Sequence, residues 1–151
     1  MQKLNFDLGL KEYEIGGGVL RFNPSDPNVY ARFAEAGKRL SAVKEKLITK
    51  AKEAGDQAPG TVMLQLMADA DRETKDILAW IFGAHNDFDA IFCGTNIMSV
   101  GANGERVITN FIHTVGLILE GGAKKCAKQQ VNSALDKARA NRDQRIESAR
   151  K

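Results

Sequence analysis

The residues with the clearest chemical potential lie in one short stretch, where His85, Asp87 and Asp89 place three metal-ligand side chains close together. Imidazole and carboxylate groups at such spacing can hold a divalent cation. Acids are equally typical of the start of a helix, because negative charge is favourable near the positive end of the helix dipole. No His-Glu-x-x-His motif or cysteine pair supplies a second set of ligands, so the helix start is the favoured interpretation.

Two further sites contain groups that could act as acids or bases. Asp69 and Asp71 are two positions apart, so on a helix they point to different faces and cannot easily share one ion or proton. His113 lies in an apolar segment, where a hydrogen-bonded core or boundary histidine is favoured over a catalytic base. Since no nucleophile or orienting acid is recognisable by motif, we expect no catalytic residue, no metal, no other cofactor and no enzyme activity.

The three glycines at 16–18 could form a phosphate-binding loop in principle. However, no Lys-Ser or Lys-Thr follows them, and they lead into a strand pattern rather than a helix. Glycine permits positive φ angles, so we predict the turn of a β-hairpin here.

Alternating apolar residues surround these glycines and predict the strands. The pattern has a period of two, which is typical of strands with one buried face. Its members are Leu4, Phe6, Leu8, Leu10, Tyr13 and Ile15 before the turn, and Leu20 and Phe22 after it. The N-terminal region is therefore predicted to be a β-hairpin or small antiparallel sheet.

A long helix over residues 26–55 is the element around which the chain is organised. Asp26 is the predicted N-cap, Pro27 suits the first helical position, and Gly55 marks the end. Its apolar residues are spaced alternately by four and three positions. This 29–47 seam consists of Val29, Phe33, Ala36, Leu40, Val43 and Leu47. We assign the six residues as candidate protein-interaction residues.

The 29–47 seam has two interpretations that the sequence leaves open. It can pack inside its own fold, which is the favoured reading, or against a second copy or a client helix. The residues follow a strict seven-residue repeat, so their apolar stripe is narrower than the one a helix usually packs against a core of helices and strands. This narrow stripe also favours a homo-oligomer.

Three later helices are predicted. The first opens near Thr61 and ends at Gly83, and the second is a short lid over 87–93 with Asn86 as its cap. After a loop or weak strand at 94–104, the clearest core helix ends at Gly121 and Gly122. The apolar face of this helix comprises Val107, Ile108, Phe111, Ile112, Val115, Ile118 and Leu119. The predicted core residues of the whole chain are Phe6, Phe22, Phe33, Leu40, Phe92, Phe111, Ile112 and Val115.

The fold class that follows is α+β and mainly α, with the hairpin or sheet packed on three or four helices. Residues 1–123 form a single domain, and residues 124–151 form a basic helical or flexible tail. The apolar runs fall far short of the about 20 residues that cross a bilayer, so no membrane partner is expected. Cys93 and Cys126 are isolated and are read as reduced thiols, which suggests the cytoplasm.

Positive charge is concentrated at the C-terminal end. Residues 124–151 contain nine basic and three acidic residues, whereas the preceding 123 contain 13 basic and 16 acidic residues. Such a tail can contact nucleic acid through phosphates, but it has no aromatic residue on which bases could stack. A solvated helical face is the favoured interpretation.

Two strings resemble small proteins encoded in the tail-gene regions of siphophages and prophages of Gram-positive bacteria, namely NFDLGLKEYEIGGGVLRFNPSDPNVYARF and AIFCGTNIMSVGANGERVITNFI. The resemblance covers most of residues 4–120, and some of those proteins are described as tail assembly chaperones. It implies a non-enzymatic protein of the bacterial host cytoplasm that coats the tape-measure protein and helps recruit tail-tube subunits. The alternative is a permanent virion structural or nucleic-acid-associated protein that uses residues 124–151.

Overall fold

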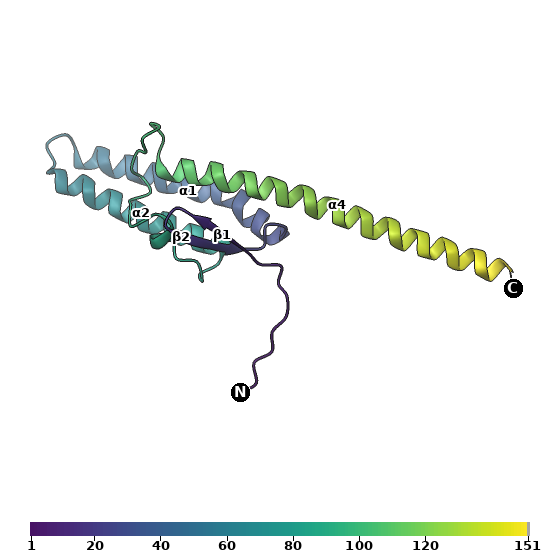
Figure 1. The fold of residues 1–151 in the computed structure, drawn as a ribbon. Coiled ribbons are helices and arrows are strands. Elements are labelled where there is room, and N and C mark those ends of the chain that lie inside the picture. Colours follow the sequence, from purple (N-terminus) through teal and green to yellow (C-terminus); the bar gives the residue numbers. More distant parts are fainter. Residues whose placement is uncertain (151) are drawn as a thin grey trace.

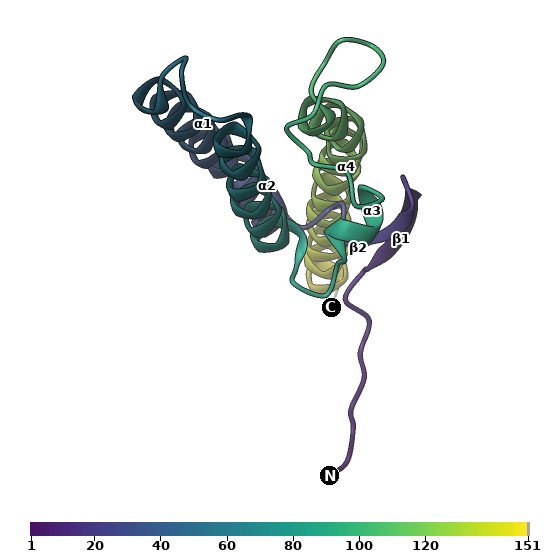
Figure 2. The ribbon, with the colours of Figure 1, turned by 90° about the vertical axis from the view of Figure 1, so that its left-hand side faces the viewer.

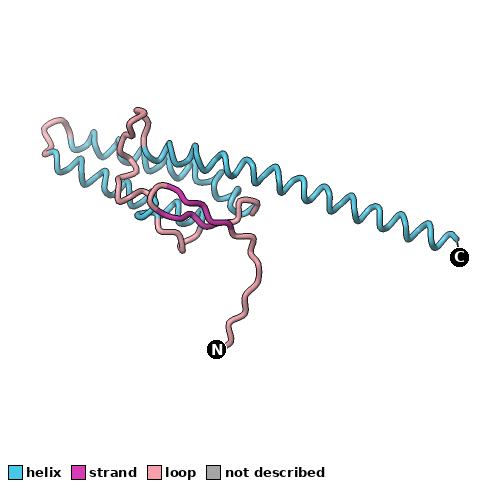
Figure 3. The backbone as a smooth tube through the Cα atoms, viewed as in Figure 1, coloured by secondary structure: helices cyan, strands magenta, loops and turns pink. Residues whose placement is uncertain are grey.

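A computed structural model describes residues 1–150, which form a two-stranded sheet and four helices (Figure 1, Figure 3). The elements in chain order are β1 (Lys11–Ile15), β2 (Gly18–Phe22), α1 (Pro27–Ala54), α2 (Gly60–Phe82), α3 (Phe88–Ile91) and α4 (Val107–Arg150). The predicted α+β, mainly helical fold with an N-terminal hairpin is confirmed. Within these residues, no helix combines the length and apolar composition that spanning a bilayer requires.

The β-hairpin turns at the glycines, as the sequence predicts. β1 and β2 are antiparallel, with Tyr13 opposite Leu20. Gly16 has a φ of +55°, and a Cβ at this position would lie 2.0 Å from the carbonyl oxygen of Ile91. The Gly17 N–H donates to that same oxygen at 3.1 Å. Glycine is therefore required both by the turn and by its close packing on the end of α3.

α1 and α2 form a long antiparallel helical pair. The Asp26 carboxylate accepts a hydrogen bond from Asn28 N–H at 2.9 Å, which confirms the predicted N-cap of α1. α2 begins at Gly60, and Gly83 follows its last residue with a positive φ. The pair forms one side of the molecule, and the hairpin, α3 and α4 lie on the other side (Figure 2).

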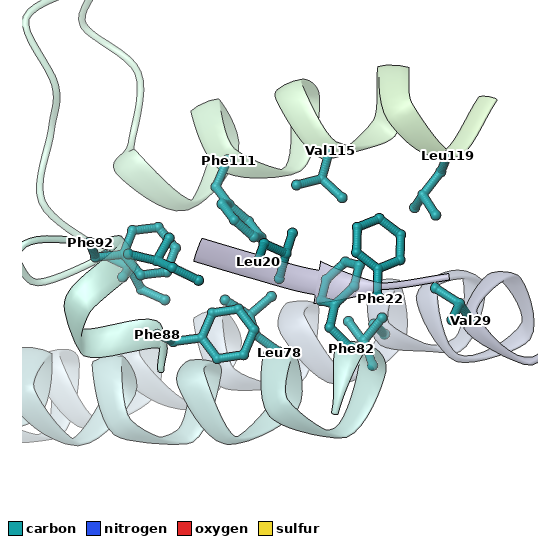
Figure 4. Packing of buried hydrophobic residues seen from close by; sticks show 14 residues of the cluster. Leu20, Phe22, Val29, Leu78, Phe82, Phe88, Phe92, Phe111, Val115 and Leu119 are labelled. Atoms are coloured by element: carbon teal, nitrogen blue, oxygen red, sulfur yellow. The ribbon is translucent and has the colours of Figure 1, made fainter. Parts of the chain in front are cut away.

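The main core lies between β2, α2, α3 and the first part of α4. Figure 4 shows Phe111, Val115 and Leu119 of α4 above Leu20 and Phe22 of β2. The aromatic rings of the core pack edge-to-face or tilted. The ring centroids of Phe22 and Phe82 are 5.0 Å apart, and those of Phe82 and Phe111 are 6.3 Å apart. Such edge-to-face pairs add to the stabilisation that comes from burial alone.

α4 does not end at Gly121 and Gly122, so the predicted helix end is wrong. The helix continues without a break to Arg150 and extends far beyond the body (Figure 1). Gly122 is buried, and a Cβ there would lie 1.8 Å from the carbonyl oxygen of Pro24. This glycine allows α4 to cross the β2–α1 connection closely instead of terminating the helix. The final residue of the predicted tail, Lys151, lies outside the described residues.

The predicted strand over residues 4–10 is also absent. Residues 1–10 have no regular secondary structure, and Leu4 and Phe6 are 87% and 79% exposed. Phe6 is therefore not a core residue. The alternating pattern is present, but no strand within residues 1–150 lies beside it to complete a ladder. Of the other predicted core residues, Phe22, Phe92, Phe111 and Val115 are buried, and Phe33, Leu40 and Ile112 are half-buried.

Candidate protein-interaction surfaces

The 29–47 seam faces the interior of the chain but is not fully covered by it. Val29 and Ala36 are buried in the main core, and Val43 is buried in a second cluster with Ala70 and Met98. The other three residues of the seam, Phe33, Leu40 and Leu47, are only half-buried. The buried residues of the seam thus hold α1 to the body, and the half-buried residues between them remain partly accessible.

Leu40 opens onto a groove between α1 and the beginning of α4. This α1/α4 groove has a volume of about 270 Å³. It is lined by Leu40, Ser41, Lys44, Met98, Arg106, Ile108, Thr109 and Ile112. Figure 2 shows the ribbon of α4 on the other side of the molecule from the α1–α2 pair. The groove is therefore an apolar trough whose two walls come from helices distant in sequence.

Two cationic side chains lie among the apolar residues of the α1/α4 groove. Lys44 is exposed on α1, and Arg106 donates to the carbonyl oxygen of Met98 at 3.2 Å. That bond holds the guanidinium at the groove. An apolar surface with fixed positive charge is complementary to an amphipathic helix that carries acidic residues.

The projecting part of α4 forms a second candidate surface. Residues 127–150 are exposed along their whole length, so this helix is not packed against the body. Val131, Leu135 and Ile146 are its large aliphatic residues, with exposures of 58%, 51% and 46%. Six of the nine basic residues of the C-terminal region lie on this part of the helix.

The residues considered for metal binding are used elsewhere. His85 Nε2 lies 2.9 Å from the carbonyl oxygen of Arg21, whereas Asp87 accepts from Ala90 N–H at 3.1 Å. Asp89 forms an ion pair with Lys75 at 2.8 Å. Within residues 1–150, no group of three or more His, Cys, Asp or Glu side chains could hold a metal ion.

Asp71 and Asp69 point to different partners. Asp71 accepts from Ile97 N–H at 2.8 Å and pairs with Lys75 at 2.9 Å. Asp69 accepts from the side chain of Gln65 at 3.1 Å. Asp71 therefore anchors the loop before α4 to α2, a structural role that its sequence spacing did not reveal.

Two expectations about polar residues need correction. Asp87, not Asn86, caps α3. Asn86 is buried, and it accepts from Arg21 N–H at 2.7 Å and donates to the carbonyl oxygens of Arg21 and Phe82. His113 is exposed rather than a core or boundary histidine, because it lies on the side of α4 away from Phe111 and Val115.

Sequence reasoning missed the α1/α4 groove because its walls are brought together only by the fold. The half-buried positions of α1 and α4 each read as ordinary core residues when taken separately. No family model, curated protein or solved structure matches this chain. The surfaces themselves are therefore the basis for a functional proposal.

Proposed function

We propose that this chain is a non-enzymatic assembly chaperone of a phage tail, which binds tape-measure and tail-tube proteins in the cytoplasm of the bacterial host. The resemblance of residues 4–120 to proteins of phage tail-gene regions supports the identity of the clients. The observation that carries the proposal is the α1/α4 groove, in which half-buried apolar side chains remain available to a partner.

The spacing of the groove residues suits a helical client. Ile108 and Ile112 are four positions apart on α4, and Leu40 faces the same trough from α1. A client helix with apolar residues at three- and four-residue intervals can place its apolar face between these walls. Each large aliphatic side chain that becomes fully buried contributes about 1.5–3 kcal/mol.

The charge and the size of the groove agree with reversible binding. Lys44 and Arg106 attract acidic residues of a client, and such attraction accelerates encounter and weakens with salt. A groove of about 270 Å³ accepts a few anchor side chains, not a whole domain. A small contact of this kind is appropriate for an assembly factor that must leave its client.

Copurification tests this proposal. The chain is coexpressed with the tape-measure and tail-tube proteins encoded beside it, once as wild type and once as Leu40→Asp. We expect wild type to retain a client and Leu40→Asp to lose most of it, because a carboxylate is placed in an apolar trough beside the client. Leu117→Asp is the matched control, since Leu117 is 61% exposed on α4 and does not line the groove. Equal retention by both variants would contradict the proposal.

The projecting helix supports a second candidate, namely a virion structural or nucleic-acid-associated protein. Residues 127–150 are exposed and rich in Lys and Arg, so phosphates can approach them. This candidate predicts that the chain is present in stoichiometric amount in purified particles. For its nucleic-acid form, DNA retardation should fall steeply with salt and disappear when residues 124–151 are deleted. A chaperone is absent from the finished particle.

A further inference from the structure

The N-terminal arm, residues 1–7, has the sequence of a strand, but no strand of the described residues, 1–150, lies beside it. Leu4 and Phe6 alternate with polar residues and are among the most exposed large apolar side chains of the chain. The arm leaves the body immediately before β1 (Figure 1). Exposed apolar side chains on an extended segment are unfavourable in water, so this arm has the properties of a segment that completes a sheet elsewhere.

The chain holds its own arm away from its own sheet. Gly9 has a φ of +70°, and its N–H donates to the Asp7 carboxylate at 2.8 Å. The Asn23 side chain donates to the carbonyl oxygen of Leu8 at 3.0 Å. To pair with β1 of the same chain, the arm would have to reverse direction across these contacts. The geometry therefore directs the arm toward another molecule.

The sheet offers one open edge for such a strand. The outer edge of β2 is closed at Arg21, whose N–H and carbonyl oxygen both bond to the Asn86 side chain. β1 pairs only with β2 in residues 1–150, so its other edge presents free backbone donors and acceptors. At about 3.3 Å per residue, the seven-residue arm spans about 23 Å, which is enough to cover the five residues of β1.

An apolar groove lies at the turn end of β1. It has a volume of about 340 Å³ and runs between the end of β1 and the first turns of α4. The apolar side chains that line it include Ile15, Phe92, Val107 and Phe111. A strand added antiparallel to β1 brings its first residues beside this groove, while Leu4 and Phe6 lie farther along the inner face of the sheet.

We propose that two copies of this chain exchange their N-terminal arms, each arm pairing antiparallel with the β1 edge of the other copy. In the register that places Leu4 opposite Tyr13, Lys3 lies opposite Glu14. Leu4 and Phe6 then share the inner face with Tyr13, while the charged pair lies on the outer face. Glu12 is already bonded to Arg21, so Glu14 is the acid available to Lys3.

The surface area that the two exchanged arms bury is sufficient for a specific dimer. A buried aromatic side chain accounts for about 150–250 Å², and the dimer contains two copies of Phe6, two of Leu4 and two strand backbones. Together these contributions reach the about 1,000 Å² expected of a biological interface. Because exchange is reciprocal, every contact of the arm is made twice, and no apolar arm remains in solvent.

Sedimentation equilibrium of the full chain tests the exchange. We expect wild type to dimerise at micromolar concentration and Phe6→Asp to weaken dimerisation about 100-fold or more, because each dimer contains two Phe6 side chains. Leu64→Asp is the matched control, since Leu64 is 68% exposed on α2, away from the arm. Leu40→Asp in the α1/α4 groove should leave the dimer intact, which separates this test from that of client binding. A wild type that stays monomeric at about 100 μM, or a dimer that Phe6→Asp does not weaken, overturns the proposal.

Charge reversal tests the register independently of the apolar contacts. Lys3→Glu and Glu14→Lys alone each place like charges opposite one another twice per dimer, and each should weaken dimerisation about tenfold. The double variant restores opposite charges and should regain most of the wild-type affinity. Both side chains are exposed, so circular dichroism should show unchanged folding in all three variants. Additive losses in the double variant would overturn the register.

Discussion

Gly122 of α4 packs so tightly on Pro24 that a Cβ at Gly122 would lie 1.8 Å from the Pro24 carbonyl oxygen. This contact is the point at which the long helix leaves the body. Its neighbour Gly121 has no such contact, because a Cβ there would meet nothing within 4 Å. The two adjacent glycines therefore serve different purposes.

Substituting each glycine by alanine should separate these purposes. Gly122→Ala is expected to lower the free energy of unfolding by about 1–3 kcal/mol, because the backbone oxygen of Pro24 cannot move aside without shifting the chain. Gly121→Ala should raise it by up to about 1 kcal/mol through helix propensity alone. Denaturant unfolding of both variants measures the difference. Equal effects of the two substitutions would show that the crossing is not tight.

Asn86 should be among the most sensitive polar positions. Its side chain bonds to both backbone groups of Arg21 and to the carbonyl oxygen of Phe82, so it connects β2 to the end of α2. Asn86→Ala leaves these groups without their partner and is expected to cost about 2–3 kcal/mol of stability. Asn28→Ala provides the control, because Asn28 is exposed in the first turn of α1. Thermal or denaturant unfolding should show a loss for the first variant and little change for the second.

Lys75 should give the protein a component of stability that is lost in alkali. Burial lowers the pKa of Lys75, but hydrogen bonds to Asp89 and Asp71 and the charges of both acids outweigh it, so the pKa is raised overall. Because the folded pKa exceeds the unfolded one, this stabilisation is fully present below about pH 10.5 and is lost as the pH rises through the folded pKa.

Lys75→Met should therefore lower the free energy of unfolding by about 1–2 kcal/mol at neutral pH and flatten its decline in alkali. Lys46→Met is a suitable comparison. Lys46 also pairs with an acid, Glu73 at 2.7 Å, but this pair is exposed and contributes little. Unfolding curves from neutral pH to about pH 11 measure both effects. An unchanged pH profile in Lys75→Met would show that Asp71 and Asp89 are not stabilised by this ammonium group.

The projecting part of α4 should be dispensable for the fold but marginally stable as a helix. Residues 127–150 are exposed along their whole length, and most helical stability in proteins comes from tertiary packing. Deleting residues 127–151 should leave the unfolding midpoint nearly unchanged. Hydrogen exchange of the full chain should be fast in residues 127–150 and slow around Phe111 and Val115. Strong protection along the projecting helix would instead show that it is covered in solution.

Local patterns were sufficient to predict the hairpin, the helices and most of the core. The three glycines predicted the turn, Asp26 and Pro27 predicted the start of α1, and the apolar face at 107–119 predicted the buried side of α4. These features depend on residues close in sequence. Intrinsic preference and periodicity therefore carry enough information to define them.

The errors arose where distant segments decide the outcome. Gly122 has the residue type of a helix end, but its role depends on Pro24, almost one hundred positions earlier. Phe6 follows a strand pattern, yet a strand needs a partner that the described part of this chain does not supply. Asn86 has the residue type of a helix cap, but its side chain turns instead toward Arg21 on β2. The α1/α4 groove was missed for the same reason, since neither wall reveals the other.

Photocrosslinking from position 40 identifies the protein that occupies the α1/α4 groove. A photoreactive phenylalanine analogue is placed at position 40 in the α1/α4 groove, or at the exposed position 117 on α4, in cells that express the neighbouring tail genes. Position 40 should yield a crosslink to the tape-measure or tail-tube protein, whereas position 117 should yield none. A client crosslink from position 117 with none from position 40 would contradict the assignment of the α1/α4 groove as the client site.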